Sequence, residues 1–185
     1  MELDPVTFTL NKIAISQELV SDVVSSIMQT IIYHRALGTV FINFQQCQKL
    51  TNTTYMYCGD EQVNESIKQL INQIEKDIQS KPDKNLIGQI KLTFKNQEKT
   101  KYLSFLDKKP AKVFEKWLIS LEIKKNQETI HIQRVESDVQ SIVFQIVDFA
   151  NKNYDHIDES YISKSKDKIV VFPFEIEWVS QQSRN

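Results

Sequence analysis

The sequence predicts a single α+β domain, because segments of helical and of strand periodicity follow one another along its whole length. Three segments repeat apolar residues every three or four positions, which is typical of helices with one buried face. Several shorter segments alternate apolar and polar residues, which is typical of half-buried strands. Since no linker or internal repeat divides the 185 residues, we expect one domain over residues 1–185.

Each expected helix has recognisable end signals. Ser16 is a favourable N-cap for the first and Gly38 a stop signal, and apolar residues cover most of its circumference, so we expect other elements to cover most of its sides. Asp60 and Glu61 begin the second helix. The three helices are expected over residues 16–37, 60–80 and 134–153.

The strands are expected where large apolar residues alternate, over residues 6–10 with an extension to 15, 40–44, 53–57, 90–94, 117–123 and 172–178. Ile130 and Ile132 are candidates for one further short strand. Pro173 cannot donate a ladder hydrogen bond, so the last strand should be an edge strand or bulged there. The connection from Lys95 to Lys112 is far longer than an ordinary hairpin loop.

The composition excludes several classes of function. Only three glycines occur, and no two lie within twenty residues of each other, which excludes a Walker loop and a dinucleotide-binding fingerprint. Twenty-three basic residues against twenty-four acidic ones leave a net charge of −1, so no nucleic-acid partner is expected.

The compartment expected from the sequence is the cytoplasm. The first five residues lack the basic flank and apolar core of a signal peptide, and no apolar run reaches the length of a membrane span. Cys47 and Cys58 form no C-x-x-C motif, so we expect both thiols to be reduced.

Catalytic and metal-binding chemistry finds little support. The candidates fit no zinc spacing: Cys47, Cys58, His34, His131 and His156. The helix start beside Cys58 would favour a lowered thiol pKa, but a buried filler thiol is the better interpretation. His34 and Arg35 complement the dipole of the first helix and can bond its last carbonyls. Alternating Glu175 and Glu177 are typical of a solvated strand, so we expect no enzyme.

The long connection is the unusual feature of the sequence. Residues 91–125 hold ten lysines and four acids, and the centre of the connection carries Tyr102, Leu103, Phe105 and Leu106. These apolar side chains either fold back onto the sheet or form an exposed tip that docks to a protein or touches an acidic membrane. Single-stranded nucleic acid is a third interpretation, which the overall charge disfavours.

Several short motifs, in the same order and spacing, resemble the autophagy-related protein 101 family. They are the segment 28–35 (MQTIIYHR) followed by Gly38, the segment 54–56 (TYM), the segment 86–94 (LIGQIKLTF), the segment 115–117 (EKW) and the segment 174–176 (FEI). The resemblance covers nearly the whole chain.

This resemblance implies a HORMA-like fold, with three helices packed on a mainly antiparallel sheet, and a protein that is not an enzyme and needs no cofactor. It implies pairing with the HORMA domain of autophagy-related protein 13, which is stabilised thereby, and association with other subunits of the autophagy-initiation kinase complex. It also implies recruitment of downstream factors at the phagophore assembly site.

The recruiting device of animal and fission-yeast relatives is a loop with a Trp-Pro-Phe finger, and the resemblance places that finger at residues 102–104. Tyr102 takes the place of the tryptophan, and Phe105 that of the phenylalanine after a one-residue shift, so the tripeptide itself is absent. The partner-binding loop is therefore assigned to Tyr102, Leu103, Phe105 and Leu106.

Pairs of HORMA domains commonly use the third helix, whose polar side here is acidic. Residues 133–160 hold six acids against two bases, and Glu136, Asp138 and Asp148 could set the register and association rate of a partner. The alternative interpretation is an ordinary solvated helix face.

About thirty residues follow the third helix, which is short for the movable C-terminal belt of peptide-trapping relatives, so we expect one fixed conformation and no trapped peptide. Two other functions stay open at this point. A HORMA adaptor of the checkpoint or translesion type would bind a partner peptide, and a small α+β enzyme would have a polar cleft around Cys58 or His34.

Overall fold

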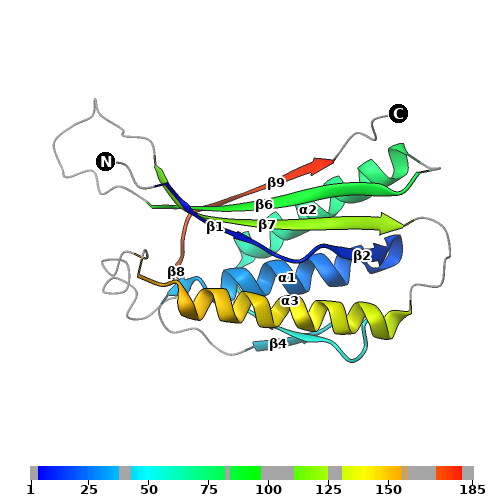
Figure 1. Cartoon of the computed structure of the whole chain (residues 1–185), viewed down its shortest axis with the longest axis horizontal. Helices are drawn as coiled ribbons and strands as arrows, with labels where there is room; N and C mark the ends of the chain where they lie inside the picture. The colour runs from blue at the N-terminus through cyan, green and yellow to red at the C-terminus, as the bar shows by residue number, and fades with distance from the viewer. Residues whose placement is uncertain are drawn as a thin grey trace.

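A computed structural model describes residues 4–37, 43–81, 84–96, 111–124, 131–155, 157 and 170–180 of the chain. Figure 1 shows a long twisted sheet with the helices running roughly along its strands. The elements in chain order are β1 (Val6–Thr9), β2 (Ile13–Ser16), the 3-10 turn η1 (Gln17–Leu19), α1 (Val20–Tyr33), β3 (Ala36–Leu37), β4 (Asn43–Gln46), β5 (Thr54–Tyr57), α2 (Glu61–Ser80), β6 (Leu86–Asn96), β7 (Lys112–Lys124), α3 (Ile132–Lys152), β8 (Val170–Val171) and β9 (Phe174–Ser180).

The main sheet has the order β1-β7-β6-β9, and β2 also pairs with β7. The ladders β6–β7 and β6–β9 are antiparallel, whereas β1 and β2 run parallel to β7. The two smaller sheets are the pairs β3–β8 and β4–β5. The prediction of an α+β fold with three helices on a mainly antiparallel, HORMA-like sheet is confirmed.

The expected first strand is divided into β1 and β2 by a bulge. Thr9 lies opposite Leu118 and Ile13 opposite Leu121, so three residues of this strand face two of β7. Phe8 before the bulge and Ile13 after it are both buried, although their positions have opposite parity. The extra residue therefore restores the apolar face to the core side of the sheet.

Helix α1 is shorter than the sequence predicted. Ser16 precedes the turn η1 and makes no side-chain cap hydrogen bond, so its predicted capping role is wrong. At the other end the helix stops at Tyr33, because Ala36 and Leu37 pair with β8 before the chain reaches Gly38. Eleven of its fourteen residues are buried, which confirms that it is covered on most sides.

The other helix predictions are close to the structure. The Asp60 carboxylate accepts a hydrogen bond from the Val63 amide at 2.9 Å and caps α2, as expected. Ile132 was a candidate for a short strand, but it lies in the first turn of α3, because the His131 carbonyl already accepts hydrogen bonds from the amides of Arg134 and Val135.

The last strand begins after Pro173 and lies at the edge of the main sheet, as the proline predicted. Phe172 falls just outside it and is buried instead of paired in the ladder. The Pro173 carbonyl accepts a hydrogen bond from the Lys95 amide at 2.8 Å, where the register of β6 and β7 shifts. This bond ties the start of β9 to the end of β6.

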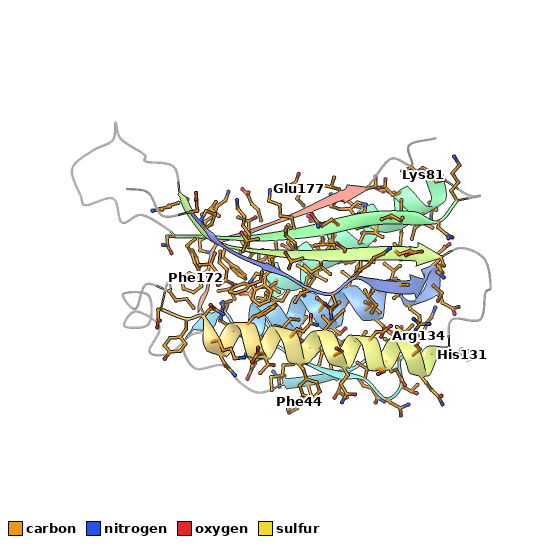
Figure 2. All side chains as sticks on the ribbon, in the orientation of Figure 1. Phe44, Lys81, His131, Arg134, Phe172 and Glu177 are labelled. Atoms are coloured by element: carbon orange, nitrogen blue, oxygen red, sulfur yellow. The ribbon has the colours of Figure 1, made fainter. Side chains whose placement is uncertain are left out.

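The core lies between the helices and one face of the main sheet, and α1 contacts both α2 and α3. Side chains of the opposite sheet face are polar or partly exposed and include the ion pairs Lys91–Glu177 and Lys95–Glu175. Figure 2 shows Glu177 on the side away from α3. The amphipathic pattern thus places the helices on one side of the sheet only.

Candidate interaction surface

The exposed side of α3 combines charged and apolar residues in one row. Glu136, Gln140, Phe144 and Asp148 follow each other at four-residue spacing, so they lie on the same face of the helix. Phe144 is 65% exposed, an unusual position for a large aromatic side chain. The row therefore places an exposed phenylalanine between two carboxylates. We call this row of four residues the α3 ridge.

The three acids predicted for this face have different surroundings. Both carboxylate oxygens of Glu136 accept hydrogen bonds from Asn52. One comes from the backbone N–H at 2.9 Å and the other from the side-chain Nδ2 at 3.1 Å. Asp148 forms an exposed ion pair with Lys152, and Asp138 is half-buried. The structure places all three on α3, and Glu136 also has a structural role.

A buried ion pair fixes the far end of α3. Nε of Arg35 donates to both carboxylate oxygens of Glu115, at 2.8 and 2.9 Å, and the Trp117 indole donates to the same carboxylate. The guanidinium also donates to the carbonyls of Ala150 and Asn153, in the last turn and at the C-cap of α3. A cation at this position complements the helix dipole, so Glu115 of β7 and Arg35, which follows α1, together orient the α3 ridge.

The predicted role of Arg35 is thus only partly right. Its Nη1 does donate to a carbonyl at the end of its own helix, that of His34, at 3.4 Å. Most of its hydrogen bonds, however, go to Glu115 and α3, which are distant in the sequence. Burial and the neighbouring guanidinium lower the pKa of His34, which favours its neutral form.

The hairpin of β4 and β5 lies beside α3, and its turn reaches the ridge through the contact between Asn52 and Glu136 (Figure 1). Asp22 of α1 holds the other side of the turn. Its buried carboxylate accepts hydrogen bonds from three successive amides, those of Gln48, Lys49 and Leu50, at 3.2, 2.6 and 3.1 Å. Two carboxylates from two helices therefore fix the hairpin.

Replacing Asp22 with asparagine is expected to loosen this turn. One charged acceptor is lost and an amide group is turned toward a backbone N–H, at a cost of about 2 kcal/mol. Exchange of the Gln48, Lys49 and Leu50 amides should accelerate roughly 30-fold, measured by NMR hydrogen exchange. The variant Asp77→Asn, in α2, is the control and should leave these three rates unchanged. Equal rates in Asp22→Asn and the parent would show that the carboxylate does not hold the turn.

The sequence interpretation missed three exposed aromatic residues of the described ranges, Phe44, Phe144 and Tyr154. The exposure of Phe144 could have been predicted from the sequence. It lies four residues before Asp148, on the same side of the helix, and outside the buried stripe of α3. Phe44, in β4, is 66% exposed, and Figure 2 shows it at the outer side of the hairpin, near α3 in this view. Phe44 could not be recognised in this way. All four residues of β4 are exposed, so the strand has no inward stripe against which an outward residue would stand out.

The residues assigned to the partner-binding loop, Tyr102, Leu103, Phe105 and Leu106, lie outside the described residues. The two strands that flank this loop are described, and aromatic side chains gather at their ends. The ring centroid of Phe114 lies 5.1 Å from that of Phe172 and 6.3 Å from that of Phe94. The centroids of Phe94 and Phe174 are 6.5 Å apart. This aromatic cluster anchors both strands where the loop departs.

The candidate nucleophile Cys58 is fully buried, and its thiol donates to the Gln29 side-chain oxygen at 3.8 Å. Burial raises its pKa, contrary to the effect expected of a helix start, and raises that of Cys47 to about 12. Both thiols are free. Among the residues that the structure describes, no group of histidine, cysteine, aspartate and glutamate could hold a metal ion.

None of the helices in the described ranges is long and apolar enough to cross a membrane. The family model described as Autophagy-related protein 101 matches residues 12–161. The chain is also 26% identical over 193 residues to a protein named Autophagy-related protein 101 from Arabidopsis thaliana, an alignment that covers 90% of this chain and 84% of the plant protein.

Proposed function

Because the chain belongs to the autophagy-related protein 101 family, we propose that it is a non-catalytic scaffold of autophagy initiation that pairs with the HORMA domain of autophagy-related protein 13. Family membership makes it an autophagy-related protein, and no enzyme activity is known for the family. The proposal adds a partner and a surface to that assignment.

The observation that supports the proposal best is the α3 ridge. A phenylalanine that is 65% exposed, in the middle of a helix that spans most of the domain, is the kind of side chain that anchors a protein interface. Asp148 lies next to it on the same face, and Glu136 lies two turns away. An apolar centre with a charged rim is the usual composition of a specific interface.

Asp148 of the ridge and the half-buried Asp138, which lies outside the ridge on the same helix, give the interface a charge preference. A partner surface with lysine or arginine opposite Asp138 and Asp148 would associate faster and in one register. This attraction is screened by salt, so the association rate should fall as the ionic strength increases.

The proposal is tested by mixing the purified chain with the HORMA domain of autophagy-related protein 13 from the same organism, followed by gel filtration and light scattering. We expect a stable one-to-one complex. Two separate monomer peaks at micromolar concentration would contradict the proposed partner.

The surface is tested with Phe144→Lys, which should raise the dissociation constant about 30-fold, as expected for an interface anchor. The matched control is Ile87→Lys, an exposed apolar residue of β6 on the bare face of the sheet, away from the helices. Circular dichroism checks that both variants are folded. Equal affinities of the two variants would exclude the α3 ridge from the interface.

The charge preference is tested with Asp148→Lys and Asp138→Lys, which should slow association several-fold at low salt. These two are cleaner than Glu136→Lys, because Glu136 also binds Asn52 and its replacement would disturb the hairpin. Association rates that do not depend on salt in the parent would argue against the charged rim.

We also propose that the loop with Tyr102 and Phe105 helps recruit downstream autophagy factors and that the protein acts in the cytoplasm and at the phagophore assembly site. The aromatic cluster supports this role, because its ring contacts join the two strands from which the loop departs. Tyr102→Ala with Phe105→Ala should reduce recruitment of other initiation factors in cells while leaving pairing in solution unchanged. Loss of pairing would assign these residues to the heterodimer instead.

The two rival functions are less well supported. The family match favours an autophagy role over a HORMA adaptor of the checkpoint or translesion type. The enzyme alternative needs a polar cleft around Cys58 or His34. Cys58 is fully buried and its pKa is raised, and His34 is half-buried beside Arg35.

A further inference from the structure

The free edge of β4 is the most unusual backbone feature of the described residues. All four residues of this strand, Asn43, Phe44, Gln45 and Gln46, are exposed, and β4 pairs only with β5 there. A hairpin of two four-residue strands is marginal on its own, and here side chains fix its turn rather than its outer strand. The outer side of β4 therefore offers an exposed strand edge next to a turn whose position is fixed.

The hydrogen-bond pattern identifies which backbone groups are available. The Cys47 amide donates to the Thr53 carbonyl at 3.0 Å, and bonded pairs alternate along an antiparallel ladder. Gln45 and Asn43 therefore direct their backbone groups toward β5, opposite Tyr55 and Tyr57. Phe44 and Gln46 direct theirs away from β5, to the free edge.

This edge lacks the features that block pairing with another strand. Its residues carry no charge and include no proline. The edge strand β9 of the main sheet, by comparison, carries Glu175 and Glu177 at alternate positions, and both form ion pairs across to β6. Charge protects this edge, and β4 carries none.

The side chains around the edge define the segment that would fit. Phe44 lies opposite Met56, so the outward face of the hairpin has an apolar centre. A carboxylate lies at the turn end of the hairpin, where Asn52 binds Glu136. An extended segment with an apolar residue in its middle and a basic residue at the end nearer α3 is complementary.

We infer that β4 accepts an extended segment of the partner HORMA domain as a third strand, so that the partner is held by main-chain hydrogen bonds as well as by side chains of the α3 ridge. The inference rests on the proposed function, and it extends the interface from the helix to the hairpin that Glu136 links to it. Strand addition of this kind supplies affinity from the backbone and specificity from alternate side chains.

Hydrogen exchange by NMR tests this directly, on the chain alone and in complex with the HORMA domain of autophagy-related protein 13. The Phe44 and Gln46 amides should exchange at least tenfold more slowly in the complex, whereas those of Asn43 and Gln45 should change little. Protection confined to α3 would overturn the added strand and leave the heterodimer intact. Absence of any complex would overturn both proposals.

A pair of variants separates the edge from the side chain. Gln46→Pro removes the outward N–H at a position where an edge strand tolerates proline, and Gln46→Ala removes only the side chain, which donates to the Thr51 carbonyl. The dissociation constant should rise at least tenfold for Gln46→Pro and less than threefold for Gln46→Ala. Equal affinities for two folded variants would overturn the inference. If Gln46→Pro is not folded by circular dichroism, the exchange experiment decides.

Discussion

Replacing Glu115 with glutamine is expected to lower the free energy of unfolding by about 3 kcal/mol, because it leaves the buried Arg35 guanidinium without a counter-charge. The side chains of both residues are at most 2% exposed, so water cannot compensate for the lost carboxylate. The Trp117 indole loses the charge of its acceptor in the same step. Denaturant unfolding followed by circular dichroism measures the difference.

The partly exposed ion pair between Lys12 and Glu122 provides the matched control, since its side chains are 50% and 24% exposed. The Lys12 hydrogen bond lowers the pKa of Glu122, but both side chains are solvated, so Glu122→Gln should cost less than about 1 kcal/mol. A second readout is exchange of the amides near Asn153, which should accelerate in Glu115→Gln alone because Arg35 orients that end of α3. Similar losses of stability in the two variants would refute a special role for the buried pair.

The helices of this protein could be predicted well from sequence because their stripes are local signals. The inward residues of α2 and α3 repeat every three or four positions, and the Asp60 cap lies at the helix it serves. The end of α1 could not be predicted in the same way. It depends on the pairing of Ala36 with Val171, more than 130 residues further along the chain.

The parallel pairing of β1 and β2 with β7 could not be predicted from the sequence pattern either. Alternation shows that a segment is a strand, but it does not identify the neighbouring strand or its direction. The change of parity between Phe8 and Ile13 was a local sign of the bulge, and it could be recognised only after β7 supplied the register.

In the candidate site too, features with a local sequence signal could be predicted, and features that depend on contacts between distant residues could not. The acids of α3 were predicted as one polar face, and the structure leaves Asp148 exposed but Glu136 and Asp138 half-buried. The dual role of Glu136 was not predictable, since its partner Asn52 lies in the turn between β4 and β5, 84 residues away in the sequence. The free edge of β4 required the ladder itself, because the direction of each backbone N–H depends on which residues pair with β5.

The motif around Gly88 acquires a physical reason in the structure. The ring of Trp178, in β9, lies over this glycine, and a Cβ placed there would be 2.2 Å from the nearest ring atom. The indole also donates to the Asp77 carboxylate of α2 at 2.9 Å. A single tryptophan thus joins the edge strand to both β6 and α2, and the glycine provides the room for its ring.

Gly88→Val is therefore expected to expel the ring and cost about 3 kcal/mol, near the upper end of the range for overpacking. The emission of Trp178 should shift to longer wavelength, while Trp117, which is fully buried, keeps its blue emission. Trp178→Leu provides the control, since the smaller side chain leaves space for valine and should reduce the cost of Gly88→Val by at least about 1 kcal/mol in the double variant. Strictly additive losses would show that the glycine and the tryptophan do not depend on each other.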